Sequence, residues 1–169
     1  KAGGYALPAV NVSSSSTINA VLEAAARNQA DVIIQLSNGG AQFYAGQGLK
    51  DGAKAKILGA VSAAQHVHLM AEYYGVCAVL HTDHAKKGLI PWVDGLLDNG
   101  QAYFKQHGQP LFSSHMLDLS EEPMEFNLSE CARVLKRMAP LNMSLEIELG
   151  VTGGEEDGIG KEMDECADN

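Results

Sequence analysis

Several features that mark particular classes of protein are scarce or missing in this sequence. The three cysteines, Cys77, Cys131 and Cys166, are odd in number and far apart, so reduced thiols are expected rather than a disulfide framework or a cysteine-type zinc site. No apolar run approaches the roughly 20 residues that span a bilayer, and the first residues lack the apolar stretch of a signal peptide. These absences predict a cytoplasmic protein without a membrane partner.

Basic residues are also few. Lys and Arg total 12 against 21 Asp and Glu, which gives a formal net charge of -9, and no basic stripe is visible. Such a charge repels a phosphate backbone, so nucleic acid is not expected as a partner. No lysine interrupts an apolar strand, and a Schiff-base mechanism would therefore lack its usual buried amine.

The sequence does contain enough apolar residues for a sizeable core, at 46% of 169 residues. Short apolar runs alternate with longer helical patterns, which is typical of repeated βα units and a parallel sheet. The expected strands are residues 6–12, 32–37, 76–81, 111–118 and 144–150. The expected helices run from the serines at 13–16 to about residue 28, and over 57–74, 91–104 and 124–138.

Polar residues at the strand ends help to choose between two α/β architectures, a doubly wound sheet and a barrel. They lie at or just beyond the C-terminal ends of the strands: Asn11, Ser37, Asp83, His84, Asp118, Glu148, Glu155 and Glu156. In a (β/α)8 TIM barrel these ends converge on one site, and a complete barrel needs about 250 residues. The chain is therefore expected to be a single partial domain over residues 1–169, covering about the first five βα units.

The densest group of reactive side chains is the run His81-Thr82-Asp83-His84 at the end of an expected strand. Successive strand residues face opposite sides, so Asp83 and His84 need the looser geometry of a strand-to-loop junction to share a pocket. This pattern is compatible with two interpretations, a metal site and a hydrogen-bonded loop. The histidines at 66, 68, 107 and 115 are interpreted as packing or surface residues.

A second group of carboxylates follows the fifth expected strand. Alternation places Glu146 and Glu148 on one strand face, which is costly inside a barrel unless a cation or donors compensate. Glu155 and Asp157 are read more simply as a solvated acidic loop. Near the second strand, Ser37 and the following Asn-Gly-Gly could hold an anion with backbone amides and a hydroxyl.

Several stretches together resemble the class II, metal-dependent fructose-1,6-bisphosphate aldolases, in the subgroup with the long active-site loop. They are Ala6-Leu-Pro-Ala-Val-Asn11, Gln35-Leu-Ser-Asn-Gly-Gly40, Leu80-His-Thr-Asp-His84, Pro91-Trp-Val-Asp-Gly-Leu-Leu97, Leu111-Phe-Ser-Ser-His-Met116, Asp118-Leu-Ser-Glu-Glu122, Leu145-Glu-Ile-Glu-Leu-Gly150 and Thr152-Gly-Gly-Glu-Glu-Asp-Gly158. The resemblance implies cleavage of fructose 1,6-bisphosphate to dihydroxyacetone phosphate and glyceraldehyde 3-phosphate.

The resemblance also implies the roles of individual residues. Asp83 would be the acid/base at the carbon 4 hydroxyl, and His84 would bind the catalytic zinc. Glu156 would exchange the carbon 3 proton of dihydroxyacetone phosphate from a mobile loop. A Lewis-acidic metal suits this chemistry because it stabilises charge that develops on the substrate without a lysine.

Four further residues are implied to contact substrate or metal. Asn11 and Ser37 would bind substrate, Ser37 near a phosphate. Asp118 and Glu148 would lie close to the zinc or at a second divalent or monovalent cation. A homodimer is also implied.

The family's other two zinc-binding histidines and its glycine-rich phosphate loops are expected beyond the fifth strand, so this half alone is expected to be inactive. Cleavage of tagatose bisphosphate, and phosphate binding by a non-catalytic half-barrel, remain alternatives.

Overall fold

The computed structural model describes residues 4–150, 154–156 and 159–161, and its main feature is a five-stranded parallel sheet in the order β1-β2-β3-β4-β5. The strands are β1 (Ala9–Asn11), β2 (Val32–Leu36), β3 (Ala78–Ala85), β4 (Ser114–Leu117) and β5 (Ser144–Ile147). A separate antiparallel pair contains β6 (Gly154–Glu156) and β7 (Ile159–Lys161). Strand order follows chain order, as in a barrel wall built unit by unit.

Helices connect successive strands. They are α1 (Ser15–Arg27), α2 (Asn38–Ala45), α3 (Gly52–Tyr74), α4 (Ile90–His107) and α5 (Met124–Met138), with short 3-10 turns η1 (Lys87–Leu89) and η2 (Ala139–Leu141). Their ends carry recognisable signals: Ser14 and Thr17 form a capping box, and Gly75 ends α3 in the left-handed conformation. No helix in the described ranges is long and apolar enough to cross a membrane.

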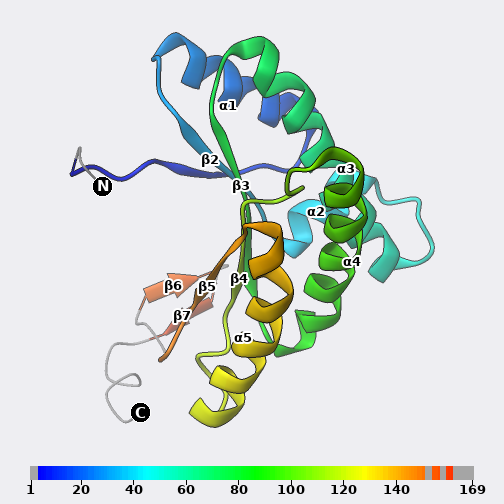
Figure 1. Cartoon of the computed structure of the whole chain (residues 1–169), viewed down its shortest axis with the longest axis vertical. Helices are drawn as coiled ribbons and strands as arrows, with labels where there is room; N and C mark the ends of the chain where they lie inside the picture. Colours follow the sequence, from blue (N-terminus) through cyan, green and yellow to red (C-terminus); the bar gives the residue numbers. More distant parts are fainter. Residues whose placement is uncertain (1–3, 151–153, 157–158, 162–169) are drawn as a thin grey trace.

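The helices cover one face of the sheet, as Figure 1 shows for α2, α4 and α5. Along β2 the side chains alternate, with Val32, Ile34 and Leu36 buried and the intervening residues only half-buried. The buried face packs against apolar helix residues, among them Ile18, Leu22, Val67, Val93, Leu96, Leu97 and Val134. Helices on a single face distinguish the wall of a barrel from a doubly wound sheet, which carries helices on both faces. The molecule thus has the architecture of the first five strands of a TIM barrel with the four helical connections between them.

Several expected strand boundaries are wrong. The third strand runs to Ala85 instead of ending at His81, because the polar side chains of residues 81–84 find partners on neighbouring strands. The first, fourth and fifth strands are shorter than expected. The first starts at Ala9, the fourth starts at Ser114, and the fifth ends at Ile147 instead of residue 150.

The segment after Ser37 is a helix, α2, where a glycine-bearing loop was expected. Packing explains the difference. Helices α2 and α3 approach so closely that a Cβ at Gly59 would lie 1.8 Å from the Ala41 carbonyl oxygen. Helix α3 also begins at Gly52, earlier than the expected residue 57, because Asp51 caps it by accepting a hydrogen bond from the Lys54 amide.

Candidate active site at the carboxyl ends of the strands

Asp83 joins the first three strands at their carboxyl ends. Its Oδ2 accepts hydrogen bonds from Asn11 Nδ2 over 3.1 Å and from Gln35 Nε2 over 2.9 Å. These donors come from β1 and β2, so residues far apart in sequence fix one carboxylate. The remaining oxygen, Oδ1, lies 3.9 Å from Nε2 of His84.

His84 lies between Asp83 and Asp118. Its Nδ1 is 3.5 Å from Asp118 Oδ2, and Asp118 directly follows β4. Burial alone would raise the pKa of Asp118, but hydrogen bonds from the Ser120 hydroxyl and amide, together with the nearby imidazole, outweigh burial and lower that pKa. Asp118 is therefore an ionised carboxylate beside the imidazole.

The backbone of β3 is irregular where these groups lie. Its register against β4 shifts between Thr82 and Ala85, and His84 has a φ of 31°. This irregularity breaks the alternation of side chains, so that Asp83 and His84 line the same cavity. The expected loose geometry at this junction is confirmed, although it occurs within the strand.

A second polar layer lies on the same sheet face. Nδ1 of His81 is 2.7 Å from Ser114 Oγ, and its Nε2 is 3.4 Å from Glu146 Oε2. Burial lowers the pKa of His81 more than the carboxylates of Glu146 and Asp83 raise it. A carboxylate on this face of the strand needs a cation or a donor nearby, and His81 gives Glu146 a polar neighbour.

Glu148 borders the same cavity, which has a volume of about 370 Å³ and is also lined by Gln35, Asp83 and His84. Its backbone carbonyl accepts a 2.7 Å hydrogen bond from Nδ2 of the buried Asn127 in α5. The helix therefore fixes where the chain leaves β5.

Ser37 is the N-terminal capping residue of α2. Its Oγ accepts a hydrogen bond from the Gly40 amide over 3.1 Å, which caps the helix. A capping oxygen uses its lone pair, and its proton remains available for donation. Ser37 lies two residues beyond Gln35, at the same edge of the sheet.

Two residues remain to be placed, the expected site residue Glu156 and the unexpected one Gln35. Glu156 ends β6, but its side chain lies outside the described residues. The sequence does not single out Gln35, although its amide donates to Asp83. The available signal was a polar residue within the apolar strand Val32–Leu36.

The four histidines read as packing or surface residues keep such roles in the structure. His66 lies 2.8 Å from Asn19 Oδ1 and His68 lies 3.0 Å from the Leu111 carbonyl oxygen. His107 stacks on Tyr103, and His115 is fully buried.

The residues present fit part of a zinc site. Metal-ligating histidines commonly direct their other ring nitrogen at a carboxylate, as His84 does toward Asp118. Across residues 4–150 and the two short strands, however, no three His, Cys, Asp or Glu side chains gather to hold a metal ion. Catalytic zinc usually has three protein ligands, so the described residues alone do not form such a site, and His84 with Asp118 beside it is a single candidate ligand.

Comparison with known protein families shows which family the chain belongs to. Residues 1–168 match the family model of class II fructose-bisphosphate aldolase. The chain belongs to this aldolase family. Its aldolase relatives include proteins called fructose-bisphosphate aldolase in Edwardsiella ictaluri, 58% identical over 160 residues, and fructose-bisphosphate aldolase class 2 in Escherichia coli K12, 58% identical over 161 residues.

Both alignments cover 94% of this chain and 45% of the relative, so the chain spans about half the length of these aldolases. A crystal structure of the Campylobacter jejuni fructose-bisphosphate aldolase is 57% identical and superposes with a TM-score of 0.84, covering 90% of this chain and 44% of that one. The aldolase fold and the five βα units therefore agree with a solved member of the family.

Proposed function

We propose that the protein to which this chain contributes is a metal-dependent aldolase that reversibly cleaves fructose 1,6-bisphosphate to dihydroxyacetone phosphate and glyceraldehyde 3-phosphate. The observation that supports this most directly is the placement of Asp83, held by two amides, next to His84, which faces Asp118. The name shared by the curated relatives favours fructose over tagatose bisphosphate.

In this proposal Asp83 is the acid/base at the carbon 4 hydroxyl. Asn11 and Gln35 both donate to Oδ2, which leaves Oδ1 as the oxygen that takes the hydroxyl proton as the bond between carbons 3 and 4 breaks. An amide donor cannot accept that proton, so the two amides orient the base without competing with it.

His84 would hold a catalytic zinc ion together with ligands outside the described residues. When bound, the metal acts as a Lewis acid that stabilises the charge developing on the ketone oxygen of the substrate. Asp118 would orient the His84 ring, and Asp118 and Glu148 would lie close to this metal or to a second divalent or monovalent cation. The ionised state of Asp118 suits both roles.

The remaining roles concern substrate. Asn11 would contact the sugar while it holds Asp83, and the Ser37 hydroxyl would donate to a phosphate oxygen. Glu156 would exchange the carbon 3 proton of dihydroxyacetone phosphate. We also propose the homodimer and the cytoplasmic location that the resemblance implies, and light scattering on the purified enzyme tests the dimer.

The test uses a completed enzyme, here meaning this chain joined to the part of the Escherichia coli relative that it does not cover. Chelator should abolish cleavage of fructose 1,6-bisphosphate, and zinc or cobalt should restore it. His84→Ala should lose bound metal and activity together. Activity that survives chelation and is destroyed by borohydride with substrate would indicate a Schiff-base mechanism instead. Faster cleavage of tagatose bisphosphate would reassign the substrate.

A further inference from the structure

His84 occupies a backbone conformation that must be held by its surroundings. Its φ of 31° lies in the left-handed region, which few residues other than glycine adopt. Such a conformation is unfavourable for a residue with a side chain and persists only where neighbouring contacts impose it. The contacts on both sides of His84 therefore help to keep its ring beside Asp118.

On the N-terminal side, β3 is tied to β4 by two side-chain pairs. His81 Nδ1 lies 2.7 Å from Ser114 Oγ, and Thr82 Oγ1 lies 2.7 Å from His115 Nδ1. On the C-terminal side the Ala85 carbonyl accepts a 3.1 Å hydrogen bond from the Asp118 amide. Beyond that point regular pairing with β4 ends.

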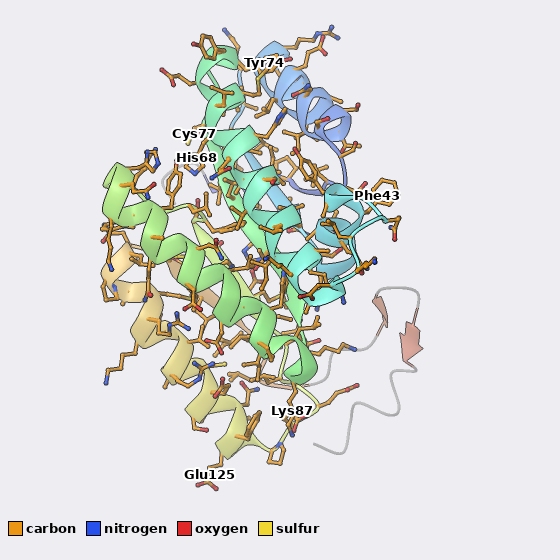
Figure 2. The ribbon with its side chains drawn as sticks, turned by 90° about the vertical axis from the view of Figure 1, so that its right-hand side faces the viewer. Phe43, His68, Tyr74, Cys77, Lys87 and Glu125 are labelled. Carbon is orange, nitrogen blue, oxygen red and sulfur yellow. The ribbon has the colours of Figure 1, made fainter. Side chains whose placement is uncertain are left out.

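Lys87 makes the next connection to the same neighbouring segment. Its ammonium donates to Glu122 Oε2 over 2.7 Å and lies 4.7 Å from the centroid of the Phe126 ring. Figure 2 shows Lys87 beside the first turn of α5, where Glu125 is labelled. One ammonium thus contacts a carboxylate before α5 and an aromatic face within it.

We propose that Lys87 is a positioning residue for His84. By fastening the segment after β3 to the segment after β4, it maintains the left-handed backbone of His84 and the 3.5 Å separation between His84 and Asp118. This role rests on the proposed function, because it matters to catalysis only where His84 binds metal.

The ordinary alternative is a surface ion pair, which contributes little to stability. Lys87 is 56% exposed, and solvent screens an exposed pair of this kind. The two interpretations differ in what a substitution changes. Loss of a surface pair affects only overall stability, whereas loss of a positioning contact affects the metal ligand three residues away.

The experiment compares variants of the completed enzyme for zinc affinity, measured by competition with a chelator. Lys87→Met keeps the aliphatic chain and removes the charge. We expect it to weaken zinc binding about three- to tenfold, the combined size of an exposed ion pair and a cation–π contact. Lys87→Arg should restore the affinity, because a guanidinium can also pair with a carboxylate over an aromatic ring.

Two further measurements separate positioning from general stability. Amide hydrogen exchange over residues 85–89 should speed up in Lys87→Met, while the melting temperature should change by less than about 3 °C. The matched control is Lys86→Met, since Lys86 is exposed and has no ion pair with another described residue. It should leave zinc affinity unchanged.

Unchanged zinc affinity in Lys87→Met would overturn the proposal, as would equal weakening by Lys86→Met, which would indicate a general charge effect. A lower melting temperature with normal zinc affinity would reduce Lys87 to a stabilising surface residue. A completed enzyme that binds no zinc even without these substitutions would instead contradict the proposed function.

Discussion

The side-chain amide of Asn127 donates a 2.7 Å hydrogen bond to the backbone carbonyl of Glu148. The same nitrogen donates to the Leu119 carbonyl over 3.1 Å, and the Asn127 side chain is buried. One residue of α5 thus fastens the segment after β4 and the end of β5. Both of these segments carry candidate site residues.

Asn127→Ala should therefore destabilise the completed enzyme. Two carbonyl groups would lose a side-chain donor, although the Leu119 carbonyl keeps the Glu122 amide as a donor. Each lost hydrogen bond costs about 0.5–1.5 kcal/mol. Urea unfolding measures the change. Asn99→Ala is the matched control, because among the described residues the Asn99 amide donates to the Gly95 carbonyl of its own helix alone. Similar losses in both variants would show that Asn127 is an ordinary helix residue.

Asp83→Ala should separate acid/base catalysis from metal binding. We expect metal content near that of the unsubstituted enzyme and a kcat lower by about 10²–10⁴-fold, the usual contribution of a general acid/base. Metal analysis and steady-state kinetics on the same preparations provide the test. Equal loss of metal and rate, as expected for His84→Ala, would make Asp83 a structural residue.

Gln35→Met should lower kcat by a smaller factor, about tenfold, because it removes one donor to a charged carboxylate and preserves side-chain size. Metal content should not change. The outcome that contradicts this expectation is a raised KM with normal kcat, which would mean that Gln35 contacts substrate rather than orienting Asp83.

Glu156→Ala tests the proton exchange at carbon 3. We expect almost complete loss of solvent deuterium exchange into dihydroxyacetone phosphate, with a far smaller change in substrate binding, because the other contacts to substrate remain. Nuclear magnetic resonance follows the exchange directly. Exchange at the normal rate would contradict the role of Glu156 and make the neighbouring Glu155 the next candidate.

Stability should fall with acid partly because of His115. Complete burial, aided slightly by the charge of His81, lowers the pKa of His115 to about 3, below the ordinary value near 6.5. Between these values the unfolded chain binds a proton that the folded chain does not, so the free energy of unfolding falls as the pH drops. At pH 5 this loss amounts to about 2 kcal/mol.

The variant Thr82→Val/His115→Leu tests this pH dependence, because it removes both members of the buried pair. Urea midpoints at pH 7 and pH 5 should differ less in the variant than in the unsubstituted enzyme. The same pH difference in both proteins would assign the acid sensitivity to other groups.

The order and type of the five strands followed from the sequence because each strand is apolar and bounded by turn signals. Helix α2 did not follow, since glycines at 39 and 40 argue against a helix, and its packing against α3 and the Ser37 cap stabilise it there. The C-terminal end of β3 could not be predicted either. Polar residues 81–84 resemble a loop until their partners on β1, β2 and β4 are known.

The candidate site was likewise predictable only where local sequence carries the signal. Asp83 and His84 were recognisable by their spacing, and the barrel arrangement predicted that Asn11 and Asp118 would come near them. The contact between Gln35 and Asp83 joins residues 48 positions apart. Such a pairing depends on the register of β2 and β3, which local sequence does not specify.

The capping role of Ser37 affects how natural variation at this position should be interpreted. Ser, Thr, Asp and Asn all cap helices well, so a lineage that is selected only for a stable α2 can exchange them freely. A lineage that must also bind phosphate there would reject Asp, whose negative charge repels the ligand. Retention of a small polar residue at position 37 is thus no sign of substrate binding, whereas a consistent absence of Asp would be one.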